Sequence, residues 1–266
     1  MLFRPTFSYL SDVYEDCLIR YLNNPKYRNN LKLALANTSN GKKILTNDEE
    51  VDAYIALYGA HHYYKLHSAF DTLDISKFRG KKIEIFTYGS GPATETCVLI
   101  DYLISKNIDL AIKRIILIEP SFTSLQRGEQ YVKSTFITSH RGLEIKVINK
   151  NLEVLDNEDV NSQTETVKLH IFSNILDVEQ VDLNSLAILL KKSQKGANYF
   201  LCISPNYSPA KQRIDRFYHL MSELFQISNI SVNAECVKGR LWLMRQGGFV
   251  DKQIERYQRI FMTYAS

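Results

Sequence analysis

The feature that most constrains the fold of this chain is a short apolar run, followed by a glycine turn and then an apolar helical pattern. Residues 83–86 (Ile-Glu-Ile-Phe) are rich in β-branched and aromatic side chains and are predicted to form a buried strand. Gly89 and Gly91 flank a sharp turn, and Pro92 suits the first helical position, where its fixed φ is helical and its missing N–H has no partner to lose. Since glycine leaves the main chain bare, a ligand can approach this turn closely.

The turn is predicted to lie beyond the carboxyl end of a parallel strand, where nucleotide-shaped ligands bind in α/β sheets. A Walker phosphate loop is excluded because no Gly-Lys-Ser or Gly-Lys-Thr follows. An ordinary tight turn accounts for two glycines about equally well, so the ligand interpretation depends on residues further along the chain.

Strand and helix patterns alternate from residue 83 onward, which is typical of an α/β sheet. The predicted strands are 83–86, 114–119, 143–148, 167–172, 199–203, 230–237 and 257–264. The predicted helices are 92–106, 122–134, 182–193 and 210–226, and the stretch 238–253 is predicted to be irregular. We therefore predict a seven-stranded sheet with helices on both faces over residues 80–266, preceded by a helical cap over residues 1–79.

The predicted cap holds a helix over 7–36, interrupted at Asn23-Asn24-Pro25, and a longer helix over about 46–73. The longer helix is rich in tyrosine and histidine, at Tyr54, Tyr58, His61, His62, Tyr63, Tyr64 and His67. Such a stripe could line a ligand, but helical aromatic residues more often pack into a core, and we favour the core interpretation. No metal site is expected, because the adjacent His61 and His62 face different ways and no HExxH motif is present.

The composition is that of a globular protein, with 45% hydrophobic and 23% charged residues. The net charge of +4 permits a nucleic-acid partner without arguing for one. The four cysteines are far apart and form no CxxC pair, which argues against metal and redox motifs; they are Cys17, Cys97, Cys202 and Cys236. Without a signal-like segment or an apolar run of membrane length, we expect a cytoplasmic protein with no membrane partner; the sequence does not indicate its oligomeric state.

A second signal stands at the end of the second predicted strand. Glu119 follows an apolar run and lies 28 residues after Gly91, where roughly 20 residues separate the corresponding groups in dinucleotide folds. The connection over residues 105–113 accounts for the extra length. A carboxylate at a strand tip can accept hydrogen bonds from both hydroxyls of a ribose, or it can cap the next helix. With the glycine turn upstream, we prefer the ribose interpretation.

Taken together, these segments resemble a class I S-adenosylmethionine-dependent methyltransferase. The resemblance lies in residues 88–94 (Tyr-Gly-Ser-Gly-Pro-Ala-Thr), residues 119–121 (Glu-Pro-Ser) and residues 172–174 (Phe-Ser-Asn), together with the closing pair of strands. It covers roughly residues 80–266 and implies a Rossmann-like fold. Residues 119–121 are also similar, more weakly, to methyltransferase-like proteins associated with the mitochondrial ribosomal small subunit.

The resemblance implies S-adenosylmethionine as the cofactor and assigns a role to each matching residue. Gly89 and Gly91 would border its methionine part, and Glu119 would hold its ribose. Asn151 and Leu152, after the third strand, would flank the adenine, while Ser173 and Asn174 would lie beneath the sulfonium. The cofactor-binding set implied in this way is Tyr88, Gly89, Gly91, Glu119, Asn151, Leu152, Ser173 and Asn174.

Two residues depart from the pattern of the family. Thr87 stands where an acid usually precedes the first glycine, and Ala93 replaces the third glycine. Since threonine cannot offer a carboxylate to the cofactor's amino group, Thr87 favours an alternative: an inactive methyltransferase-like protein that acts as a binding or assembly module. A nicotinamide-dependent oxidoreductase is a third possibility, disfavoured by the missing third glycine and by the final strand pair.

The sequence does not single out a catalytic base or a methyl acceptor. Asp177, His61 and Tyr58 are candidates for a base. RNA, protein and small-molecule acceptors all remain open. Residues 204–207 (Ser-Pro-Asn-Tyr) resemble the proline motif of amino-group nucleic-acid methyltransferases, but they differ at its third position and follow the fifth predicted strand instead of the fourth. An ordinary proline turn is the preferred interpretation.

Overall fold

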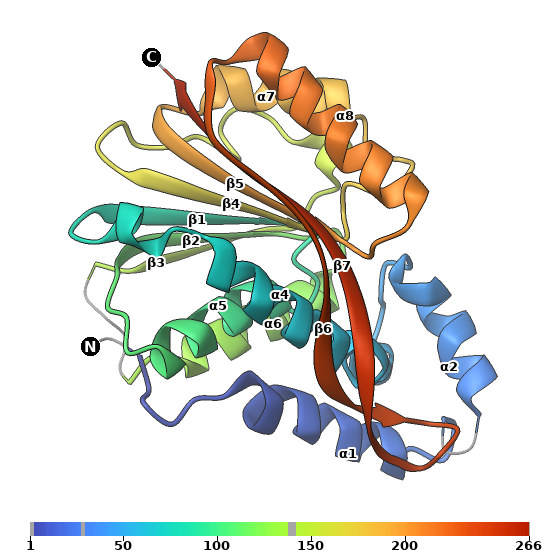
Figure 1. The fold of residues 1–266 in the computed structure, drawn as a ribbon. Helices are drawn as coiled ribbons and strands as arrows, with labels where there is room; N and C mark the ends of the chain where they lie inside the picture. Colours follow the sequence, from blue (N-terminus) through green and yellow to red (C-terminus); the bar gives the residue numbers. More distant parts are fainter. Residues whose placement is uncertain (1–2, 28–29, 138–141, 266) are drawn as a thin grey trace.

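A twisted sheet forms the centre of the molecule. The computed structural model describes residues 3–27, 30–137 and 142–265. Within them, seven strands follow the order β3-β2-β1-β4-β5-β7-β6 (Figure 1). Their bounds are β1 Lys82–Tyr88, β2 Ala111–Ile118, β3 Glu144–Ile148, β4 Val167–Ser173, β5 Gly196–Ser204, β6 Ile227–Leu243 and β7 Gly248–Ala265. Strands β1 to β5 are parallel, whereas β7 runs antiparallel to both β5 and β6. The predicted Rossmann-like α/β sheet is confirmed.

Helices cover both faces of the sheet, as predicted (Figure 1). The α-helices are α1 Glu15–Asn23, α2 Leu31–Thr38, α3 Asp48–Tyr54, α4 Ala60–Thr72, α5 Thr94–Ser105, α6 Phe122–Ser134, α7 Leu183–Ser193 and α8 Ser208–Leu224. The shorter helical segments are η1 Leu10–Tyr14, η2 Ser39–Gly41, η3 Ile55–Gly59, η4 Ile75–Phe78 and η5 Leu152–Val154. Helices α4, α5 and α6 lie on one face, and α7 and α8 lie on the other.

The central strands are mostly apolar because both of their faces are buried, with Glu84, Lys168 and His170 as buried exceptions. Successive side chains of a strand point to opposite faces, so Ile83 and Ile85 of β1 join one apolar core while Phe86 and Tyr88 join the other. The first core also contains cap residues such as Phe70, so the N-terminal helices and the sheet share one hydrophobic core. The boundary predicted at residues 79 and 80 falls between η4 and β1.

The long predicted cap helix is an unbroken series of helical turns from Asp48 to Thr72. It begins at Asn47, whose side chain accepts a hydrogen bond from the N–H of Glu50. Its middle segment η3 is π-helical, and π-helical turns inside α-helices are frequent at functional sites. Gly59 ends this segment, and a Cβ there would lie only 2.8 Å from the Tyr9 hydroxyl oxygen.

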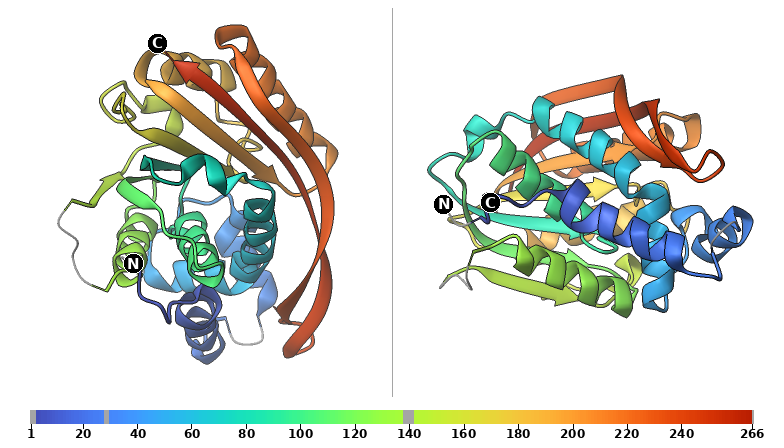
Figure 2. Two further views of the ribbon diagram at one scale, coloured as in Figure 1. Left: turned by 60° about the vertical axis from the view of Figure 1, so that its left-hand side comes forward. Right: turned by 90° about the horizontal axis from the view of Figure 1, so that it is seen from below.

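The predicted irregular stretch over residues 238–253 was wrong. Strands β6 and β7 form one long hairpin that continues past the sheet and packs beside α4 (Figure 2). Gly239 of β6 fits against the Tyr64 ring, where a Cβ would lie 2.5 Å from Cδ2. Glycines and charged residues interrupt the apolar pattern of this stretch, and its strand character comes from tertiary contacts that no local pattern reveals.

Arg256 of β7 fastens the hairpin to the cap. Its side chain is 0% exposed, and its Nη2 donates to Ser68 Oγ of α4 over 3.1 Å and to Glu235 Oε2 of β6 over 2.7 Å. A buried guanidinium needs such partners to offset its lost hydration. The last strand pair of the chain is therefore joined to a helix near its beginning.

Candidate functional site

A large cleft lies at the carboxyl ends of the parallel strands. From β1 the chain moves outward to β2 and β3, and later places β4 and β5 on the other side of β1. The loops after β1 and β4 therefore diverge, which makes this point the topological switch of the sheet, where ligands of α/β proteins bind. A cleft of about 960 Å³ opens there, between the strand ends and the cap.

The glycine turn gives this cleft a floor of exposed main chain. Both glycines have positive φ, +61° at Gly89 and +49° at Gly91. A Cβ on Gly89 would lie 2.6 Å from Cδ1 of Ile175, whereas one on Gly91 would meet nothing within 4 Å. The space beside Gly91 is thus open to a ligand, as the sequence predicted.

Glu119 lies next to the turn. The main-chain N–H of Gly91 donates to its Oε2 over 2.9 Å, and the N–H of Ser121 donates to its Oε1 over 2.9 Å. Burial raises the pKa of this carboxyl, and the two amide hydrogen bonds act against that effect. A carboxylate has about four acceptor positions, so this fixed group retains the capacity to accept from two further hydroxyls.

The structure brings nearly the whole predicted cofactor set to one cleft. The predicted residues that line it are Gly89, Gly91, Glu119, Asn151, Leu152, Ser173 and Asn174. The side chain of Tyr88 points into the core instead, where its ring stacks on Phe172 at a centroid distance of 4.2 Å and its hydroxyl bonds His170 Nδ1 over 3.0 Å. Tyr88 can therefore offer only its main chain to a ligand.

Ala93, at the third glycine position, keeps the backbone shape that glycine would have. Its φ is +58°, in the left-handed region that strains a residue with a Cβ. Gly128 of α6 packs directly against it, since a Cβ on Gly128 would lie 2.9 Å from the Ala93 Cβ. The missing glycine on the turn is thus compensated by a glycine on the facing helix.

The Thr87 side chain lies in the core, where its hydroxyl already has hydrogen-bond partners. It is fully buried, and its hydroxyl lies 3.1 Å from the Thr96 hydroxyl of α5 and 3.4 Å from the Ile116 carbonyl oxygen. The side chain at this position is therefore turned away from the cleft. An acidic side chain that contacts a ligand in the cleft therefore has to come from another position of this chain.

The tyrosine and histidine stripe of the cap is divided between two surroundings. The residues of the stripe that line the cleft are Tyr54, Tyr58, His61 and His62. Its other residues pack against neighbouring rings: Tyr63 stacks on Tyr9, and His67 lies edge-on to Tyr102. Tyr54, Tyr63 and Tyr64 pack against the first core, so the core interpretation holds for these three residues, although Tyr54 also lines the cleft.

Two charged residues that the sequence analysis missed lie beside the cleft. Lys65 of α4 lines it, and its Nζ donates to Asn174 Oδ1 over 2.8 Å. Glu95, in the first turn of α5, interacts with the Ser173 side chain just beneath the lining. A charged residue in a mainly uncharged segment was the available signal for both: Lys65 interrupts the aromatic stripe, and Glu95 follows the glycine turn at the start of a mainly apolar helix.

Burial dominates the ionisation of these groups. It raises the pKa of Glu95 to about 8 and lowers the pKa of Lys65 to about 8. It also lowers the pKa of His61 to about 4, and the nearby Lys65 and Lys252 act in the same direction. The pKa of His62 is lowered well below its usual value for the same reason. Both histidines are therefore neutral near pH 7.

The three candidate bases all line the cleft, at different places. Tyr58 belongs to η3 and lies 3.3 Å, oxygen to oxygen, from Thr38. Asp177 follows β4 and accepts a hydrogen bond from the Tyr207 hydroxyl over 2.9 Å. His61 projects from the first turn of α4. Asp177 and His61 thus approach the cleft from the sheet and from the cap, respectively.

Several buried polar atoms around this cleft have no hydrogen-bond partner within the described part of the chain. They are Ser90 Oγ, His62 Nδ1, Glu95 Oε2 and Asp177 Oδ1. Buried polar groups in proteins are nearly always paired, so these four atoms are available to a polar ligand or to water in the cleft.

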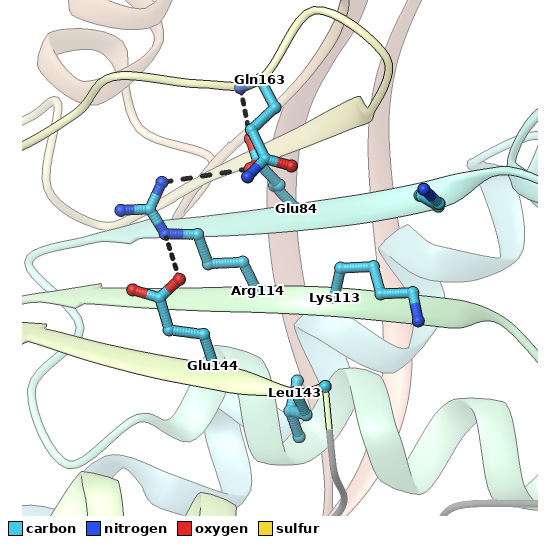
Figure 3. Close-up of a pocket in the computed structure, with 8 residues that line it drawn as sticks. Glu84, Lys113, Arg114, Leu143, Glu144 and Gln163 are labelled. Carbon is cyan, nitrogen blue, oxygen red and sulfur yellow. Dashed lines mark hydrogen bonds and ion pairs between the residues drawn. The ribbon is translucent and has the colours of Figure 1, made fainter.

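A second hollow lies at the amino ends of the strands and has a volume of about 430 Å³. Its acidic groups surround Arg114. Figure 3 shows Arg114 between Glu84 and Glu144, with Nε 3.3 Å from Glu144 Oε2, and the N–H of Gln163 directed at Glu84. Lys82 and Lys113 also line this hollow, so it carries charges of both signs.

Across the three described ranges, no group of three or more His, Cys, Asp or Glu residues could hold a metal ion. In the same ranges, no helix has both the length and the apolar character needed to cross a bilayer.

The fold is the one that the resemblance implied, a parallel Rossmann-like sheet closed by an antiparallel strand pair. Solved methyltransferase structures are similar to this chain over most of its length. A SAM-dependent methyltransferase from Leishmania major shares 10% identity, with 93% of this chain and 90% of that one covered and a TM-score of 0.46. The plantazolicin methyltransferase BpumL, solved in complex with SAH, shares 10% identity, with 96% of each chain covered and a TM-score of 0.46.

A third similar structure is a SAM-dependent methyltransferase from Methanosarcina mazei. It shares 13% identity, with 72% of this chain and 97% of that one covered and a TM-score of 0.44. No family model matches the sequence, and no curated protein matches it.

Proposed function

We propose that this chain is an S-adenosylmethionine-dependent methyltransferase whose cleft at the topological switch point holds the cofactor. The observation that supports this most directly is the pairing of Gly91 and Glu119. The open glycine turn offers bare main chain, and the same turn fixes a carboxylate that retains free acceptor positions. That combination suits an adenosine ribose, with Asn151 and Leu152 beside the adenine.

When bound, S-adenosylmethionine supplies a methyl group on a sulfonium, which needs no covalent activation by the protein. The work left to this chain is to align the methyl acceptor, exclude water and accept a proton where the acceptor carries one. The cap residues Tyr54, Tyr58 and His62 form the wall of the cleft opposite the strand ends. His61 is neutral near pH 7, but its lowered pKa makes it a weak proton acceptor. Asp177 has a carboxylate oxygen without a partner in the described ranges and is the better candidate.

Calorimetric titration with S-adenosylmethionine, S-adenosylhomocysteine and NAD tests the proposal. We expect the first two to bind and NAD not to bind. Glu119→Ala should weaken binding of both about 10- to 100-fold, as expected for lost hydrogen bonds to a charged group. Glu153→Ala is the matched control, since Glu153 lines the same cleft but is exposed.

Binding of NAD in preference to the adenosyl sulfur compounds would replace this proposal with the oxidoreductase alternative. Unchanged affinity in Glu119→Ala would remove the ribose assignment. A methyltransferase-like binding module, the other alternative, predicts that the cofactor does not bind, or that it binds without any transfer to an RNA, protein or small-molecule acceptor.

A further inference from the structure

Lys65 is a buried cation with unmet hydrogen-bonding capacity. Its side chain lines the cleft and is 4% exposed. An ammonium group has three N–H donors, and Asn174 Oδ1 is the one acceptor that Nζ has among residues 3–27, 30–137 and 142–265. Asp177 and Glu95 influence its charge from a distance without a direct bond in these ranges. A buried cation in this state calls for an anionic partner.

Glu95 is a buried acid that also has unmet hydrogen-bonding capacity, and so it complements Lys65. It is 5% exposed, and its Oε2 has no hydrogen-bond partner in the described ranges. Its surroundings are cleft residues, because the groups that act on its charge include Ser173, Glu119 and Lys65. A buried carboxylate and a buried ammonium thus lie near the same end of one cleft, each incompletely paired.

Their position in the sheet separates them from the adenosine end. Asn151 and Leu152 follow β3, and Glu119 follows β2, on one side of β1. Ser173 and Asn174, which contact Glu95 and Lys65, end β4 on the other side. A ligand that lies across the glycine turn with its ribose at Glu119 therefore extends its far end toward Lys65 and Glu95.

We infer that Lys65 and Glu95 together recognise a zwitterionic amino-acid group, Lys65 binding its carboxylate and Glu95 its ammonium. This inference rests on the proposed function, in which the group is the methionine end of the cofactor. It also gives Thr87 an explanation, since the acid absent from β1 is supplied from the first turn of α5. Because Lys65 belongs to the cap and Glu95 to the sheet domain, one bound ligand joins the two parts.

The ionisation of the pair supports the same assignment. Burial raises the pKa of Glu95 to about 8 and lowers that of Lys65 to about 8, so the surrounding protein solvates neither charge well. A zwitterion brings each side chain its opposite charge.

The test compares S-adenosylhomocysteine with 5′-methylthioadenosine, which keeps the adenosine and sulfur but lacks the amino-acid group. For the unmodified chain we expect S-adenosylhomocysteine to bind about 10- to 100-fold more tightly. In Lys65→Met and in Glu95→Gln this preference should shrink about tenfold, while affinity for 5′-methylthioadenosine stays unchanged. Lys42→Met is the matched control, as Lys42 is an exposed lysine that lines the same cleft.

Decarboxylated S-adenosylmethionine separates the two roles. Lys65→Met should bind it as well as S-adenosylmethionine, whereas Glu95→Gln should still prefer the carboxylated compound. Equal affinity of the unmodified chain for S-adenosylhomocysteine and 5′-methylthioadenosine overturns the inference and leaves the proposed function standing. Binding of neither compound contradicts the proposed function itself. An equal loss for both compounds in the two variants assigns Lys65 and Glu95 a structural role and also overturns the inference.

Discussion

The N–H of Gly91 donates to Glu119 Oε2 over 2.9 Å, although 28 residues separate the two. This bond joins the turn after β1 to the tip of β2 and orients the carboxylate without a neighbouring cation. A carboxylate held by main-chain amides keeps its remaining acceptor positions in a fixed direction. The glycine turn and the acid therefore act as one unit, and changes that move the turn should disturb ligand binding as well as stability.

Gly128→Ala should displace the glycine turn after β1, because the added Cβ on α6 would press against it. A Cβ at this position would lie 2.9 Å from three atoms, the Ala93 Cβ, the Ala93 nitrogen and the Pro92 carbonyl carbon. Two of these atoms are main chain, so the helix has to move. We expect a loss of about 1–3 kcal/mol in the free energy of unfolding, measured by urea denaturation, together with weaker cofactor binding. Gly248→Ala, where a Cβ meets nothing within 4 Å, should change stability by less than about 0.5 kcal/mol.

Thr87→Asp restores the acid that the family carries, yet it should not improve binding. The new carboxylate would be buried beside Thr96 and the Ile116 carbonyl, with no cation to pair it. We expect the free energy of unfolding to fall by about 3 kcal/mol, while Thr87→Ser should cost about 1 kcal/mol. Tighter binding of S-adenosylmethionine by the aspartate variant would show that this position reaches the ligand after all.

Glu95→Gln should stabilise the unliganded protein, and increasingly so as the pH rises. The pKa of Glu95 is raised by burial to about 8, so from about pH 4.5 to pH 8 the folded protein holds a proton that the unfolded chain releases. Folding therefore loses stability with rising pH through this window. The advantage of the glutamine variant should grow by about 3 to 4 kcal/mol between pH 5 and pH 8.

Denaturation curves at pH 5, 6, 7 and 8 measure this difference. Glu153→Gln, at an exposed position of the same cleft, should show no such trend. A constant difference between the Glu95 variant and the unmodified chain across these pH values would mean that Glu95 is already ionised at pH 5.

Arg256→Met should loosen the hairpin from the cap. Ser68 and Gln258 would lose a buried donor, and we expect the free energy of unfolding to fall by about 2 kcal/mol. Arg240→Met removes an exposed arginine of the same hairpin, which lies over the Phe249 ring, and should cost less than about 1 kcal/mol. Similar losses in the two variants would argue against a special role for the buried guanidinium.

Local patterns predicted the sheet well because the central strands are buried on both faces. The runs at 83–86 and 114–119 are apolar for that reason, and the glycine turn and Glu119 were recognisable from their place at the strand ends. The outer halves of β6 and β7 were missed, since glycines and charged residues interrupt their apolar pattern and their strand conformation depends on each other and on Tyr64. Lys65 and Glu95 were missed for a related reason: no spacing rule shows that residues 30 apart on two helices meet at Ser173 and Asn174.

The contact between Ser68 and Arg256 spans 188 positions of the chain. During synthesis, α4 leaves the ribosome long before β7 exists. Until β7 has been made, the polar face of α4 is exposed to water or bound by a chaperone. Contacts of such long range slow folding because the entropy of closing the intervening loop is lost before any bond forms. The packing of the β6–β7 hairpin against α4 is thus completed late, after strands β1 to β5 have been synthesised.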